Sequence, residues 1–201
     1  MSPDELDEAG WIAVPDVLTS AAARTLARRC TDALAGIGDD LRVGDKLAGG
    51  TRRLTVLTER VPEVLDVVAH PAIVAAVAHV LGPDLPPADV NLRDPQPGFG
   101  GQRFHADAIP LEHGDPFIVV TAIVALCPFA EDNGATGIVP GSHRRPDLQR
   151  VAGRLEDHPD ELVLTGPAGT AFVINGHLLH RGRRNLSSAP RPALQASWRR
   201  A

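Results

Sequence analysis

From Pro87 to the C-terminus, short apolar runs alternate with turns rich in Gly, Pro and Asn. Runs of about four to eight residues between such turns are typical of antiparallel strands, because the chain crosses a sheet once and then reverses. We expect strands at residues 89–93, 103–107, 117–126, 136–139, 161–164, 170–175, 177–181 and 192–199. A series of this many short strands predicts a double-stranded β-helix, or jelly roll, in which two sheets pack face to face.

The N-terminal part of the chain carries a helical pattern instead. Residues 20–35 place apolar side chains at helical spacing, directly after an N-cap at Thr19 or Ser20. A helix is also expected near the N-terminus, with Ser2 and Glu5 as its capping signal, and a third is expected from Pro62 or Pro71 to Leu81, because Gly82-Pro83 follows it. Short strands are expected at residues 11–15 and 54–57, with a loop rich in Gly and Asp at residues 36–50.

Together these patterns predict a protein that is mainly β with flanking α-helices. We expect one domain over residues 1–201, since no linker divides the chain and no repeat is visible. In this interpretation residues 1–87 form mostly helical support, which packs outside a jelly-roll core of residues 88–201.

The composition excludes several function classes. The net charge of −5 gives no reason to expect a nucleic acid or a membrane as a partner. No apolar run approaches the roughly 20 residues that span a bilayer, and the acidic N-terminus lacks a signal region. We therefore expect a cytoplasmic protein, and we expect it to be a monomer or a homodimer.

The motif His105-Ala106-Asp107 carries the strongest chemical signal. In an extended strand, residues i and i+2 project from the same face, so this imidazole and carboxylate point into the same space. His180 supplies a second imidazole later in the chain. Two His and one carboxylate on one face of a metal leave its other positions open, as in non-haem Fe(II) oxygenases. We therefore expect His105, Asp107 and His180 to be the metal ligands and the catalytic centre.

His177 competes with His180 for the third ligand position. The two residues are three apart, so on one strand only one of them points inward. His180 is favoured because the turn-rich segment 182–190 follows it and would bring Arg191 back beside it. An Arg fork matches a carboxylate with two hydrogen bonds, so Arg191 is expected to hold the carboxylate of a co-substrate.

These residues belong to a longer series of motifs. The series is His105-Ala106-Asp107, Asn133-Gly134-Ala135, Pro140-Gly141-Ser142-His143, Gly169, His180-Arg181-Gly182, Asn185-Leu186-Ser187 and Arg191. Over residues 90–200 their order and spacing resemble the phytanoyl-CoA dioxygenase family. The resemblance implies Fe(II) held by His105, Asp107 and His180, 2-oxoglutarate bound to that iron and paired with Arg191, and O₂ as the oxidant.

Further polar residues are assigned with less support. Gln102, Asn91 and Thr121 are expected to hydrogen-bond 2-oxoglutarate, although a structural role is equally consistent with the sequence. In the family a polar side chain two residues after the last ligand assists. Gly182 stands at that position here, so Ser187 is expected to replace it. Arg93 and Arg103 are candidates for substrate contact, with a surface position as the alternative.

The expected activity is an Fe(II)/2-oxoglutarate-dependent oxygenase that hydroxylates a small organic molecule, with a secondary-metabolite intermediate favoured. Related halogenating enzymes have a small residue in place of the carboxylate ligand, so the presence of Asp107 favours oxygenation. Desaturation, epoxidation or ring closure would use the same residues. Two other functions stay open: a cupin-like metal-dependent isomerase or hydrolase that does not use 2-oxoglutarate, and a non-catalytic small-molecule binding protein on the same scaffold.

Overall fold

The structure is a computed structural model, and it describes residues 3–35, 50–55, 57–108, 114–149 and 157–200. Seven helical and nine strand elements are described within these residues. In chain order they are α1 (Pro3–Ala9), β1 (Trp11–Val14), α2 (Ser20–Ala35), β2 (Thr51–Leu54), α3 (Leu57–Arg60), α4 (Val64–Val68), α5 (Pro71–Leu81), β3 (Asp89–Pro95), β4 (Val119–Ala125), β5 (Thr136–Ile138), η3 (Ser142–Arg144), α6 (Pro146–Gln149), β6 (Leu162–Val163), β7 (Ala171–Asn175), β8 (His180–Gly182) and β9 (Ala193–Arg199).

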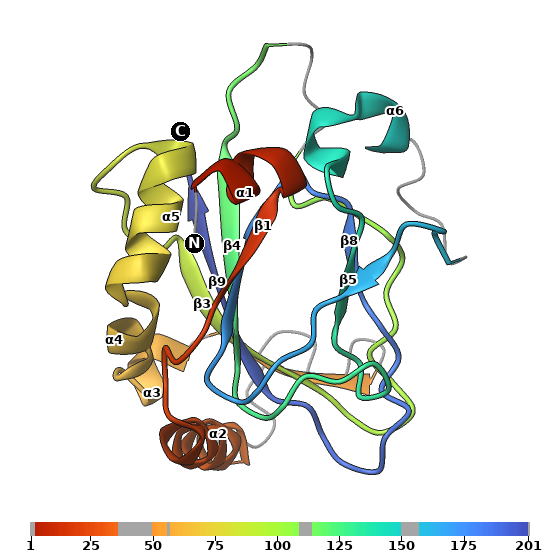
Figure 1. The fold of residues 1–201 in the computed structure, drawn as a ribbon. Helices are drawn as coiled ribbons and strands as arrows, with labels where there is room; N and C mark the ends of the chain where they lie inside the picture. Colours follow the sequence, from red (N-terminus) through yellow and green to blue (C-terminus); the bar gives the residue numbers. More distant parts are fainter. Residues whose placement is uncertain (1–2, 36–49, 56, 109–113, 150–156, 201) are drawn as a thin grey trace.

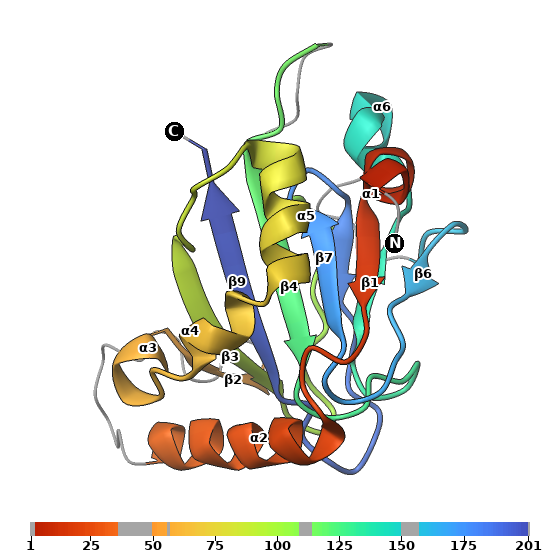
Figure 2. The ribbon, with the colours of Figure 1, turned by 60° about the vertical axis from the view of Figure 1, so that its left-hand side comes forward.

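Two antiparallel sheets form the core of the fold. The larger has six strands in the order β1-β7-β4-β9-β3-β2, and the smaller has three in the order β6-β5-β8. Figure 1 shows the smaller sheet facing the larger one, with α3, α4 and α5 on the far side of the larger sheet. Figure 2 shows α5 lying across that outer face and α2 running along one end. This arrangement agrees with the predicted jelly roll with N-terminal helices packed outside.

Strand β4 shows why both faces of the larger sheet are apolar. Every residue of β4 is buried, because helices cover one face and the smaller sheet covers the other. Val120 and Val124 belong to the cluster that also contains the helical residues, whereas Ile123 packs with Phe129 and Phe172 between the sheets. Successive residues of β4 therefore point to opposite faces of the sheet and contribute to two separate hydrophobic layers.

The predicted helices follow their capping signals. Thr19 begins α2 by accepting a hydrogen bond from the amide of Ala22, at 3.2 Å. Gly82 ends α5 with a φ of 90°, a conformation that L side chains rarely adopt. No helix within the described residues is both long enough and apolar enough to cross a membrane.

Several predicted strands differ from the structure by one or two residues at an end, and three predictions were wrong by more than that. Residues 103–107 form only an isolated bridge, between His105 and His180. The strand expected at 177–181 is β8, which begins at His180, because Asn175 accepts a hydrogen bond from the His177 amide and turns the chain after β7. Near 54–57, β2 ends at Leu54 and Leu57 begins α3. Of the loop expected at 36–50, residues 36–49 lie outside the described residues.

Candidate metal centre

The backbone holds the His105-Ala106-Asp107 segment against β8. The amide of His105 donates to the carbonyl of His180 and the amide of His180 donates to the carbonyl of His105, both at 2.9 Å. The amide of Asp107 donates to the carbonyl of Gly176 at 2.7 Å. As a result, one possible ligand atom from each of His105, Asp107 and His180 lies within 4.8 Å of the other two. The sequence-based set of ligands is therefore brought together.

Both imidazoles are oriented by backbone carbonyl groups. Nδ1 of His105 lies 2.9 Å from the carbonyl oxygen of Arg103, and Nδ1 of His180 lies 2.8 Å from that of Leu178. A carbonyl oxygen only accepts, so each Nδ1 donates a hydrogen bond to it and each Nε2 is the ring nitrogen that remains for a metal. The two rings lie 4.4 Å apart between their centroids. The backbone therefore sets the orientation of both rings.

Asp107 is oriented by a buried hydroxyl group. Thr121, on β4, donates from Oγ1 to Oδ2 of Asp107 at 2.8 Å, and Thr121 is fully buried. Oδ1 of Asp107 lies 3.6 Å from Nε2 of His180. The hydrogen bond fixes one carboxylate oxygen and leaves the other toward the imidazole, which suits a ligand in a facial triad.

The protonation state of His180 fits metal binding. Burial lowers the pKa of His180, and the neighbouring Asp107 carboxylate opposes this only in part. The imidazole is therefore neutral near pH 7, as a metal ligand must be. Two imidazole nitrogens and one carboxylate oxygen form a donor set that suits Fe(II) and leaves coordination positions for other ligands.

His177 does not join this centre. Its side chain is fully buried, and its Nε2 accepts a hydrogen bond from the amide of Ile118 at 3.2 Å. Its ring lies 5.5 Å from that of Phe117. His177 therefore packs beneath the end of β4, and His180 is the histidine that meets Asp107.

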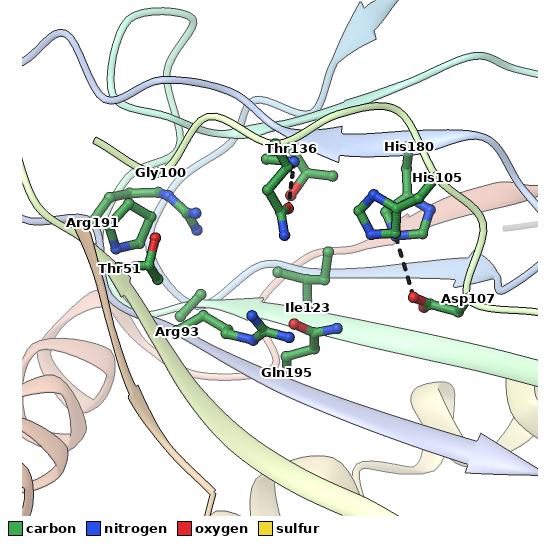
Figure 3. Close-up of a pocket in the computed structure, with 14 residues that line it drawn as sticks. Thr51, Arg93, Gly100, His105, Asp107, Ile123, Thr136, His180, Arg191 and Gln195 are labelled. Atoms are coloured by element: carbon green, nitrogen blue, oxygen red, sulfur yellow. Dashed lines mark hydrogen bonds and ion pairs between the residues drawn. The ribbon is translucent and has the colours of Figure 1, made fainter. Parts of the chain in front are cut away.

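A pocket opens next to the three ligands, between the two sheets (Figure 3). Its lining comes from β2, β3, β4, β5, β8, β9 and the Gly-rich segment before His105. The lining residues are Thr51, Arg93, Pro95, Gly100, Gln102, His105, Asp107, Ile123, Thr136, His180, Gly182, Arg191, Ala193 and Gln195.

Arg191 lies at the end of the pocket opposite Asp107 (Figure 3). Its side chain is 5% exposed, and its guanidinium carbon lies 4.4 Å from the centroid of the Phe129 ring. Its Nε is buried and has no hydrogen-bond partner among the described residues. Burial lowers the pKa of Arg191 to about 10, so the group stays cationic near pH 7. A buried cation without an acidic partner is costly, and a carboxylate ligand would relieve that cost.

Of the other residues proposed from the sequence, some line the pocket and others lie outside it. Gln102 and Arg93 line the pocket with Arg191, and Oε1 of Gln102 accepts from the amide of Gly182 at 2.8 Å. Asn91 is buried outside the lining and donates to Asp89 at 2.5 Å. Ser187 also lies outside it and bonds to Asn185 at 2.7 Å, within the turn before Arg191.

Arg103 is exposed, and its carbonyl group orients His105. Its side chain is not part of the pocket lining. Three polar lining residues were missed in the sequence: Thr51, Thr136 and Gln195. The sequence could have indicated these three residues only through the alternation of polar and apolar residues along each strand. That alternation does not show which face of the sheet carries the site.

The comparisons with known proteins agree with this geometry. The chain matches the family model for phytanoyl-CoA dioxygenase over residues 6–193. An uncharacterised protein of Mycobacterium tuberculosis is 28% identical over 205 residues, which cover 98% of this chain and 70% of the relative.

Solved structures show the same fold. SnoK, a non-haem alpha-ketoglutarate-dependent carbocyclase from nogalamycin biosynthesis, has a TM-score of 0.77 at 21% identity and covers 99% of this chain and 83% of its own. EctD from S. alaskensis with bound Fe has a TM-score of 0.77 at 18% identity, covering 98% and 75%. The structure of EctD with 2-oxoglutarate and 5-hydroxyectoine has a TM-score of 0.75 at 20% identity, and the match covers 98% of this chain and 74% of EctD. These matches confirm the jelly-roll fold.

Proposed function

The chain belongs to the phytanoyl-CoA dioxygenase family of Fe(II)/2-oxoglutarate-dependent enzymes, and we propose that it hydroxylates a small organic molecule. One observation supports the proposal: a triad suited to Fe(II) and a buried arginine, whose Nε has no hydrogen-bond partner among the described residues, lie at opposite ends of one pocket. A dicarboxylate that reaches from the metal to Arg191 satisfies both ends.

The residues of the chain have distinct tasks in this reaction. His105, Asp107 and His180 hold Fe(II), and Thr121 fixes the orientation of Asp107. Arg191 binds the distal carboxylate of 2-oxoglutarate, and its planar fork fixes both the position and the rotation of that group. Fe(II) with 2-oxoglutarate and O₂ supplies the oxidising chemistry when bound.

The pocket wall keeps the reaction selective. Ile123 lines the pocket from β4, and Phe129 packs against Arg191. These apolar surfaces reduce the number of water molecules near the reacting carbon and strengthen the interaction of Arg191 with a carboxylate. Asp107 occupies a ligand position with a negative charge, which leaves less room for a halide and favours oxygenation over halogenation.

We further propose that the substrate is an intermediate of secondary metabolism. SnoK belongs to nogalamycin biosynthesis, and EctD was solved with 5-hydroxyectoine. Both are similar to this chain in fold and are associated with different small molecules, so they support a small-molecule substrate but no particular reaction. Desaturation, epoxidation and ring closure use the same residues as hydroxylation.

A cupin-like isomerase or hydrolase is the rival function. Such a reaction needs a metal triad, but it does not need a buried arginine that binds the distal carboxylate of a co-substrate. The position of Arg191 in the pocket therefore favours a 2-oxoglutarate-dependent reaction.

The test is the conversion of 2-oxoglutarate to succinate by the Fe(II)-loaded protein in air, without a primary substrate. We expect slow succinate formation that stops in His105→Ala, while His177→Ala retains it. His177 is the matched control because it is a buried histidine near the site that does not touch the pocket. Absence of succinate from wild-type protein with one Fe(II) per chain would contradict the proposal.

A further inference from the structure

Two arginines lie directly opposite each other on β2 and β3. In the antiparallel pairing of these strands, Arg53 is the partner of Arg93, and Thr51 is the partner of Pro95. Thr51, Pro95 and Arg93 all line the pocket, so the face of the β2–β3 pair that carries both arginines is the pocket side. Like charges placed opposite each other destabilise a sheet.

Neither guanidinium group forms an ion pair with a carboxylate in the described part of the protein, although Asp107 and Asp89 lie near enough to attract Arg93. The Nε atoms of Arg53 and Arg93 are buried, and neither has a hydrogen-bond partner among the described residues. Burial and the neighbouring Arg53 lower the pKa of Arg93 to about 10, which still leaves the group cationic near pH 7.

The nearby carboxylates are already engaged. Asp94 pairs with Arg52, on the other face of the two strands. Asp89 accepts hydrogen bonds from Asn91 and Ser197. Asp107 belongs to the metal triad. Each of these three carboxylates therefore has another partner or another role, and none of them forms an ion pair with Arg93.

In the proposed function, 2-oxoglutarate does not pair with Arg93 either. The proposed function, on which this inference rests, uses one carboxylate of 2-oxoglutarate at the metal and the other at Arg191. Figure 3 shows the Arg93 guanidinium beside Gln195, between Arg191 at one end of the pocket and the triad at the other. A third anionic group can therefore reach Arg93 within the same pocket.

We propose that Arg93 binds a carboxylate of the primary substrate, so that the enzyme acts on a small organic acid. The planar fork of Arg93 matches the two oxygens of a carboxylate, and Gln195 lies beside it as a further hydrogen-bonding group. Arg93 is the one member of the opposed pair that lines the pocket, which favours a monoanion over a phosphate dianion. Arg53 raises the positive potential behind it.

The test is a binding experiment with matched probes. Protein loaded with Fe(II) and saturated with 2-oxoglutarate, without O₂, is titrated by calorimetry with benzoate and hexanoate. Their neutral amides, benzamide and hexanamide, and phenyl phosphate are titrated in parallel. The variants are Arg93→Gln, Arg93→Lys and, as a control with the same loss of charge, Arg60→Gln on the exposed surface of α3.

We expect wild-type protein to bind each carboxylate at least about tenfold more tightly than its amide, the factor expected when a charged hydrogen bond is added. Arg93→Gln should lose this preference, Arg93→Lys should retain part of it, and Arg60→Gln should leave it unchanged. Arg93→Gln should also melt at the same temperature as wild type or higher without ligand, because it removes a like-charge opposition.

Several results would overturn the proposal. These are no detectable binding of any carboxylate at millimolar concentration, a preference that survives in Arg93→Gln, and tighter binding of phenyl phosphate than of benzoate. Loss of 2-oxoglutarate binding in Arg93→Gln, to the same degree as in Arg191→Gln, would assign Arg93 to the co-substrate. The same titrations without 2-oxoglutarate separate the two proposals, since a preference that depends on Arg93 would stand even if 2-oxoglutarate did not bind.

Discussion

Replacement of Arg191 by Met tests the co-substrate site through both affinity and stability. Arg191 is 5% exposed and lies against Phe129, so Met keeps much of its apolar contact and removes only the charged fork. A hydrogen bond to a charged group contributes about 1.5–3 kcal/mol, which predicts a loss of 2-oxoglutarate affinity of about tenfold to a hundredfold. Fe(II) affinity should stay within about twofold, because Arg191 lies at the other end of the pocket from Asp107.

Thermal unfolding of the Fe(II)-loaded protein without O₂ gives the assay. At a 2-oxoglutarate concentration a hundredfold above its wild-type Kd, the ligand should stabilise wild type by about 2.7 kcal/mol. For a variant with hundredfold weaker binding, the same concentration should add only about 0.4 kcal/mol. Without ligand, Arg191→Met should be at least as stable as wild type, because it removes a buried cation that has no acidic partner in the described chain. Equal stabilisation of both proteins by 2-oxoglutarate would refute the reasoning.

Three further predictions follow from named contacts. Thr121→Val should weaken Fe(II) binding by about tenfold to a hundredfold, because it removes the hydrogen bond to Asp107. Thr121→Ser keeps a hydroxyl group and should retain most of the Fe(II) affinity. Equal Fe(II) affinity of wild type and both variants, measured by titration, would exclude a positioning role for Thr121. Gly169→Ala should destabilise the protein by about 1–3 kcal/mol from backbone strain alone, because Gly169 has a φ of +97°, and the contact of the new Cβ with the Leu18 carbonyl oxygen should add to that loss. Gly114 has the same φ but open space around its Cβ, so Gly114→Ala should lower the free energy of unfolding, measured with urea, by less than Gly169→Ala does. Wild-type enzyme that is turning over in excess chloride should give no chlorinated product by mass spectrometry, and such a product would mean that Asp107 is not a metal ligand.

The metal ligands could be predicted from the sequence because their signal is local. His105 and Asp107 are two apart, and this spacing brings them to one face of an extended segment even though only an isolated bridge forms there. The structure also places His180, and not His177, beside His105 and Asp107, although the physical reason differs in part from the one that the sequence suggested. Asn175 turns the chain before His177, so His177 is not in the strand that carries His180.

The contacts of the remaining polar residues depended on pairings that the sequence does not reveal. Thr121 was expected to face 2-oxoglutarate, and in the structure its hydroxyl group bonds to Asp107, which comes from a different segment. Asn91 and Ser187 bond to partners only two residues away, an option that is always open to short polar side chains. The opposition of Arg53 and Arg93 follows from the register of β2 on β3, which distant residues determine.

The most direct test of the metal centre is an anaerobic titration of the metal-free protein with Fe(II), followed by 2-oxoglutarate. The account predicts one Fe(II) per chain, and one 2-oxoglutarate that binds tightly only after the metal. His105→Ala, Asp107→Ala and His180→Ala should each lose most Fe(II) binding, whereas His177→Ala should keep it. Loss of Fe(II) in His177→Ala with retention in His180→Ala, or 2-oxoglutarate that binds equally well without metal, would contradict the account.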